Sequence, residues 1–139
     1  MLLVDANVLF AQADADDRQH AKVVRLLSEE PGPLITSQIV AAEADYLMLT
    51  RLGVQTEISF LHDLAAGTFI AECLTLTEFG LARDLTVRHR ELRLGLADAS
   101  LVVLAQRYDT RRIATFNERD FRAVAPLQGG AFTLLPADL

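Results

Sequence analysis

Short apolar runs alternate along the chain with longer segments in which apolar residues recur at helical spacing. The short runs have the length and composition of buried strands in a parallel sheet. We expect strands at residues 2–5, 34–36, 69–74, 112–115 and 132–135.

The longer segments predict helices, and several of them carry recognisable boundary residues. Ser37 is a suitable N-cap, while Gly53 and Gly67 stand where a helix ends. Thr77 is a second possible N-cap. We expect helices at residues 17–28, from Ser37 through Arg51, at 55–66, from Thr77 to about residue 92, at 96–108 and at 118–124.

Strands separated by helices are typical of parallel pairing, because a parallel connection must cross over the sheet. We therefore predict an α/β protein: a three-layer α/β/α sandwich with a central parallel sheet, built as one domain over residues 1–139. Ligands of such folds bind outside the carboxyl ends of the strands. Asp5 ends the first strand and Asn117 follows the fourth, so both should point into one crevice.

Composition narrows the class of protein. The chain has 139 residues, 51% of them apolar, and no run approaches the ~20 apolar residues that span a bilayer. We expect a cytoplasmic protein with no membrane partner. The net charge of −6 disfavours a tight, non-specific nucleic-acid binder. It leaves open an enzyme that contacts a phosphate chain briefly.

Basic residues are concentrated in one segment. Twelve of the thirteen basic residues are arginines, and four of them fall within residues 83–93. This segment is the best candidate for contact with phosphate, since guanidinium groups bind phosphate oxygens in pairs. A solvated helix face is the structural alternative.

Three carboxylates occupy positions where the pattern predicts burial. Asp5 ends an apolar strand; Glu43 lies in the apolar stripe of its helix; Asp98 has Leu94 before it and Leu101 after it. A buried carboxylate is costly unless it is paired or bound to a cation. The alternatives are a water-facing edge for Glu43 and helix capping for Asp98.

Carboxylate oxygens without matching imidazoles or thiols favour Mg²⁺ or Mn²⁺ over Zn²⁺. Asn117 and Asp120 are candidates for a fourth corner of this site, although their spacing also fits a helix cap. Asn7 and Ser37 are candidates for orienting the carboxylates by hydrogen bonds.

Four motifs together resemble those of the PIN-domain ribonucleases, and the short length and motif order resemble the VapC toxins of toxin–antitoxin pairs. The motifs are Val4-Asp5-Ala6-Asn7, Thr36-Ser37-Gln38-Ile39-Val40-Ala41-Ala42-Glu43, Leu96-Ala97-Asp98-Ala99-Ser100 and Thr115-Phe116-Asn117-Glu118-Arg119-Asp120-Phe121. The resemblance implies a Mg²⁺ or Mn²⁺ site formed by Asp5, Glu43 and Asp98. It also implies endonucleolytic cleavage of RNA, a homodimer and a small antitoxin partner.

One position departs from the family pattern. Many members have an aspartate two residues after the threonine, where this chain has Asn117. Either Asp120 takes over that place, so that the catalytic set is Asp5, Glu43, Asp98 and Asp120, or the site has three acids.

Three other classes of protein also use this kind of fold or site. A response-regulator receiver requires a second acid beside Asp5 and a late lysine, and both are missing. A haloacid-dehalogenase-type phosphatase requires Asp-x-Asp, and Asn7 replaces its second acid. An inert binding module that keeps the PIN fold differs from the enzyme only in activity.

Overall fold

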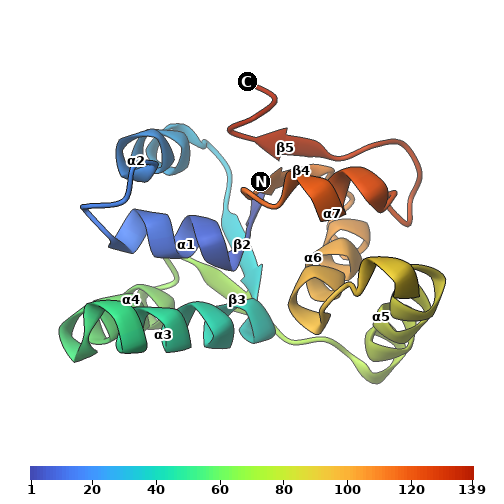
Figure 1. Ribbon diagram of the computed structural model, residues 1–139, viewed down its shortest axis with the longest axis horizontal. Coiled ribbons are helices and arrows are strands. Elements are labelled where there is room, and N and C mark those ends of the chain that lie inside the picture. The colour runs from blue at the N-terminus through green and yellow to red at the C-terminus, as the bar shows by residue number, and fades with distance from the viewer.

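The computed structural model describes all residues from 1 to 139 and has five parallel strands in a single sheet (Figure 1). The strand order is β3-β2-β1-β4-β5, which places the first strand at the centre. Its register pairs Leu3 with Ile35 on one side and with Ile113 on the other. The strands are β1 (Leu2–Val4), β2 (Leu34–Ser37), β3 (Ile70–Glu72), β4 (Arg112–Ala114) and β5 (Thr133–Leu135).

Helices cover the sheet in two layers. In Figure 1, α1 to α4 lie on the left of the sheet, and α5 and α6 lie on its right. The helices are α1 (Ala6–Ala13), α2 (His20–Glu29), α3 (Gln38–Leu52), α4 (Val54–Ala66), α5 (Leu76–Arg88), the short 3₁₀ helix η1 (Arg90–Leu92), α6 (Leu96–Arg107) and α7 (Glu118–Ala123). The predicted three-layer α/β/α sandwich is confirmed. No helix is both long enough and apolar enough to cross a membrane.

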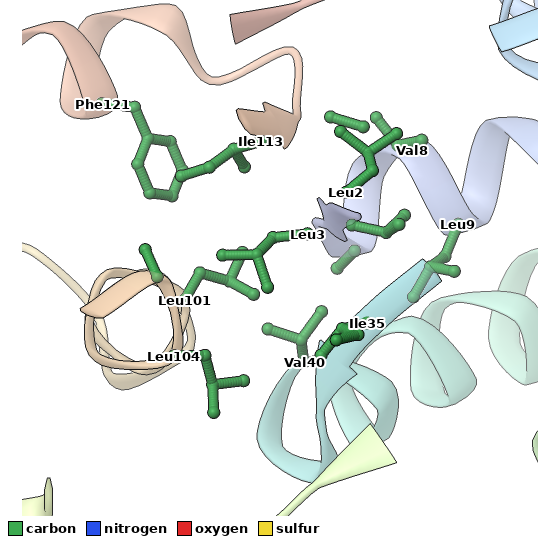
Figure 2. Close-up of a cluster of buried hydrophobic side chains, with 14 of the residues drawn as sticks. Leu2, Leu3, Val8, Leu9, Ile35, Val40, Leu101, Leu104, Ile113 and Phe121 are labelled. Carbon is green, nitrogen blue, oxygen red and sulfur yellow. The ribbon is translucent and has the colours of Figure 1, made fainter. Parts of the chain in front are cut away.

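The core lies on both faces of the central strand. Leu2, Leu3 and Val4 have no exposed surface, as expected for a strand with a helix layer on each side. Figure 2 shows Leu101 and Leu104 of α6 on one side of β1, with Leu9 of α1 on the other. This packing fixes the carboxyl ends of β1 and β4 as neighbours.

Several element boundaries differ from expectation, among them those around α1 and α5. The first strand ends at Val4 because Asp5 is the N-cap of α1, a helix that the apolar pattern did not reveal. Helix α5 begins at Leu76, after a capping box between Thr75 and Glu78, so Thr77 is not its cap. It also ends at Arg88, before η1, and does not continue to residue 92.

Candidate active site

Asp5 lies at the carboxyl end of the central strand and is only 4% exposed. One carboxylate oxygen accepts the Ala6 N–H at 2.7 Å, and the other accepts the Thr115 hydroxyl at 2.7 Å. Burial raises the pKa of Asp5, and both hydrogen bonds act against that rise. Asp5 therefore links the end of β1 to Thr115, the residue that follows β4, because these two strands are neighbours in the sheet.

Glu43 lies on α3 but does not face the core, which corrects the expected burial. The core contacts of α3 come from Val40, Ala41, Ala44 and Met48, and Glu43 is exposed at the edge of this stripe. Its pKa is nevertheless raised, first by partial desolvation and then by the negative charge of Asp5. Glu43 therefore reaches the solvent side of the same site.

Asp98 lies in the first turn of α6 and is half-buried. Its pKa is raised to about 7 by desolvation and by the charges of Asp5, Asp120 and Glu43. A carboxylate that served only as a helix cap would have a lowered pKa, because the helix N-terminus favours its charged form. Four carboxylates thus repel one another at one edge of the sheet.

Asn117 links Asp98 and Asp120 by hydrogen bonds at the fourth corner of the site. It caps α7, with its side-chain oxygen accepting the Asp120 N–H at 3.4 Å. Its amide nitrogen donates to Asp98 Oδ2 at 3.1 Å and to Asp120 Oδ2 at 2.9 Å. The capping role is confirmed, and the same side chain bridges two acids. Asp120 Oδ1 is buried and has no hydrogen-bond partner.

Ser37 and Asn7 bind groups other than the carboxylates. The Ser37 hydroxyl caps α3 by accepting the Val40 N–H at 2.9 Å, and it lies 2.7 Å from the Ser100 hydroxyl. Asn7 Oδ1 accepts the Phe116 N–H at 3.1 Å. Both residues therefore position the segments that carry the acids, and neither orients an acid directly.

Sequence reasoning missed two residues of this site. Thr115 contacts Asp5 directly, and Ser100 ties α6 to the start of α3. The sequence could have identified Thr115, because it directly follows the fourth strand, and side chains at the carboxyl ends of parallel strands point into the crevice. No local pattern could have identified Ser100, since its partner Ser37 lies 63 residues away in the sequence.

The donors at this site fit a hard divalent cation in their chemistry. They are carboxylate oxygens, one of them buried without a partner, and their mutual repulsion is the kind that a cation relieves. However, no three acidic, histidine or cysteine side chains form a ready set of metal ligands. Thr115, Ala6 and Asn117 donate hydrogen bonds to oxygens of Asp5, Asp98 and Asp120, so a cation would bind at the lone pairs that remain on these carboxylates.

Comparison with known protein families and sequences gives two matches that cover most of the chain. The PIN domain model matches residues 2–127. Ribonuclease VapC26 of Mycobacterium tuberculosis is 39% identical to this chain over 136 residues, which are 97% of this chain and 100% of that protein.

Solved structures share the fold. VapC20 of Mycobacterium tuberculosis, a sarcin-ricin loop cleaving toxin, is 22% identical with a TM-score of 0.78 and covers 84% of this chain and 90% of its own. VapBC2 from Rickettsia felis, bound to a DNA fragment from their promoter, is 14% identical with a TM-score of 0.69. FitAcB from Neisseria gonorrhoeae is 17% identical with a TM-score of 0.63. The last two each cover 96% of this chain and 97% of their own.

The family model spans all four carboxylates of the site, and the VapC26 ribonuclease aligns along nearly the whole chain. The fold is that of the VapC structures. On these grounds the chain belongs to the PIN-domain family and is a homologue of the VapC ribonucleases.

Proposed function

We propose that this protein is a metal-dependent endoribonuclease and the toxin of a toxin–antitoxin pair. The observation that carries the proposal is the group of four acids at the carboxyl edge of the sheet, where burial and then mutual repulsion raise the pKa of Asp98 to about 7. Such a group costs stability unless a cation is bound there. The 39% sequence identity to Ribonuclease VapC26 supports RNA as the substrate.

Asp5, Glu43 and Asp98 would hold Mg²⁺ or Mn²⁺, with Asp120 as the fourth acid. The cation would lower the pKa of a bound water and polarise the phosphodiester. In the proposed reaction, the water oxygen bonds to phosphorus, the bond from phosphorus to the 3′ oxygen breaks, and the products carry 5′-phosphate and 3′-hydroxyl ends. Glu43 and Asp98 are alternative acceptors of the water proton, because both have raised pKa values.

The names of the relatives support a proposal about partners. VapBC2 is a two-protein assembly by its name, and VapC20 is named a toxin. We infer that this chain, too, pairs with a small antitoxin protein and forms a homodimer. Co-purification of a small protein expressed from the adjoining gene would support the first inference.

Two measurements test the nuclease proposal. Purified protein is incubated with structured RNA in Mn²⁺ or Mg²⁺, and then with a chelator in excess. We expect cleavage only with the cation. In a thermal melt, Mn²⁺ at a hundredfold excess over its dissociation constant should stabilise the protein by about 2.7 kcal/mol.

The same two measurements on Asp98→Asn provide the contrast, because that variant should neither cleave nor gain comparable stability from Mn²⁺. Cleavage that continues undiminished in chelator would rule out the metal-dependent mechanism. A protein that binds Mn²⁺ and RNA but never cleaves would be the inert binding module.

A further inference from the structure

A cleft of about 700 Å³ opens beside the acidic site. Its walls come from α1, the turn before α2, the second half of α3 and the loop that joins β4 to α7. Two wall residues, Asn7 and Phe116, adjoin Asp5 and Thr115 in the sequence and bind each other at 3.1 Å. Leu47, one turn after Glu43 on α3, forms another part of the wall. The cleft is therefore lined by the same segments that carry Asp5, Glu43 and Thr115.

Hydrogen-bond donors without partners line this cleft. The Asn7 oxygen is occupied by Phe116, while its amide nitrogen donates to nothing in the structure. Arg18 and Arg51 also line the cleft, and neither forms an ion pair. The Arg51 guanidinium lies 5.9 Å from the centre of the Phe10 ring, so the ring supports one face of it and leaves its N–H edges free.

The absence of ion pairs at these two arginines is unusual in this chain. Seven of its twelve arginines lie within 4.0 Å of a carboxylate. Of the remaining five, Arg18 and Arg51 share this cleft. The other three, Arg88, Arg90 and Arg93, lie in the segment that leads into α6 and Asp98. All five unpaired arginines thus belong to the cleft or to a segment that leads to the acidic site.

The two acids in the cleft wall are already engaged. Asp17 accepts the Gln19 N–H at 2.7 Å, and Glu118 lies 3.4 Å from Arg122. The groups that remain available are guanidinium and amide donors beside the aromatic ring of Phe116. A ligand that fits them has many acceptor oxygens and a flat unsaturated ring, which describes a nucleotide.

We propose that this cleft binds one nucleotide of the RNA substrate, next to the phosphate that is cut. Arg18 and Arg51 hold its backbone phosphate, Asn7 donates to an acceptor of the same nucleotide, and the Phe116 ring stacks on its base. The proposal rests on the proposed ribonuclease function and names where the substrate lies. It also explains how an acidic protein retains RNA, since the arginines that lack an ion pair lie in the cleft or in the segment that leads to the acidic site.

Binding of a fluorescein-labelled, single-stranded 20-nucleotide RNA of random sequence tests the proposal. Fluorescence anisotropy is measured in chelator, with Asp98→Asn as the parent so that the probe is not cut. The test variant adds Arg18→Ala and Arg51→Ala. The control adds Arg25→Ala and Arg83→Ala, which removes the same charge from exposed arginines on α2 and α5 that do not line the cleft. We expect the test variant to raise Kd at least tenfold and the control to raise it less than twofold.

Salt dependence and stacking provide independent readouts. The slope of log K against log salt should become less steep by about 0.7 for each RNA phosphate that the variant no longer neutralises. Phe116→Leu in the same parent should raise Kd at least threefold without changing that slope, because leucine cannot stack on a base. A thermal melt of each variant confirms folding.

Each of the other outcomes would overturn either the proposed nucleotide site or the proposed ribonuclease function. If the test variant and the control bind RNA equally, the cleft holds no nucleotide. If the test variant keeps its RNA affinity but loses a co-purifying protein, the cleft is a protein-docking site. If wild-type protein neither binds nor cuts RNA with Mn²⁺ present, the ribonuclease function itself fails, whatever the cleft does.

Discussion

At the scale of single residues, burial and the neighbouring carboxylates raise the pKa of Asp98 from 3.8 to about 7. Between these pH values the folded chain binds more protons than the unfolded chain. The contribution of Asp98 to the free energy of unfolding of the metal-free protein therefore falls as pH rises from about 4 to about 7, and it levels off above that.

Asp98→Asn removes this charge, so the variant should melt higher than wild type in chelator at pH 7.5. The full shift corresponds to about 4 kcal/mol at 1.36 kcal/mol per unit. Solvent screening at this half-buried group reduces the expected gain to about 1–2 kcal/mol. Thermal melts at pH 5.0 and 7.5 measure it, with Asp16→Asn on an exposed turn as the control. A lower melting temperature for Asp98→Asn at pH 7.5 would identify Asp98 as a structural cap.

Asp120 and Asn117 can be separated by cleavage rates. Asp120→Asn removes a negative charge from the site and should lower activity at least tenfold. Asn117→Ala removes the cap of α7, at a cost of about 1 kcal/mol, and releases Asp98 and Asp120 from their shared amide. It should lower activity less, because every charge remains. Full activity in Asp120→Asn together with a dead Asn117→Ala would reverse the assignment.

At the scale of elements, Arg107 at the end of α6 holds three neighbouring segments. It donates to Glu72 of β3 at 3.0 Å, to the Cys73 carbonyl at 2.6 Å and to Glu78 of α5 at 3.0 Å. Arg107→Ala should lower the free energy of unfolding by about 1–3 kcal/mol, because it removes charged hydrogen bonds of this kind. Urea unfolding followed by circular dichroism measures this.

Arg25→Ala is the matched control for Arg107→Ala. Arg25 also pairs with a carboxylate, Glu29 at 3.0 Å, but both side chains are largely exposed on α2. Its removal should change stability by less than about 0.5 kcal/mol. Equal effects from the two substitutions would mean that Arg107 is an ordinary surface ion pair.

Periodicity predicted the sheet and most helices because apolar strands and capped helices leave local signals. Ser37, Gly53 and Gly67 mark real boundaries of α3 and α4. Helix α1 was missed because its eight residues follow the first strand without a break, and only the N-cap Asp5 separates the two. The four acids were predicted as a group, whereas the exposure of Glu43 depends on how α3 packs against α1 and α4, which no local pattern contains.

At the scale of the whole molecule, we predict that two copies of the chain associate as a homodimer. Large apolar side chains remain exposed on α3, α4 and α5, among them Tyr46 at 65%, Ile58 at 51% and Leu76 at 91%. Burying such residues in a second copy would be favourable. Light scattering at micromolar concentration should give twice the mass of the chain. A single mass of one chain across that range would contradict the prediction.

The central place of β1 has a consequence for the newly made chain. The residues that form the site with Asp5 lie late in the sequence. They are Asp98, Thr115, Asn117 and Asp120, and all of them follow the first two-thirds of the chain. Until β4 emerges from the ribosome, β1 is an open edge and Asp5 lacks Thr115. At 5–20 residues per second, about 6–25 seconds separate the synthesis of Asp5 from that of Asp120. The acidic site of each copy therefore cannot assemble until translation of that copy is nearly complete.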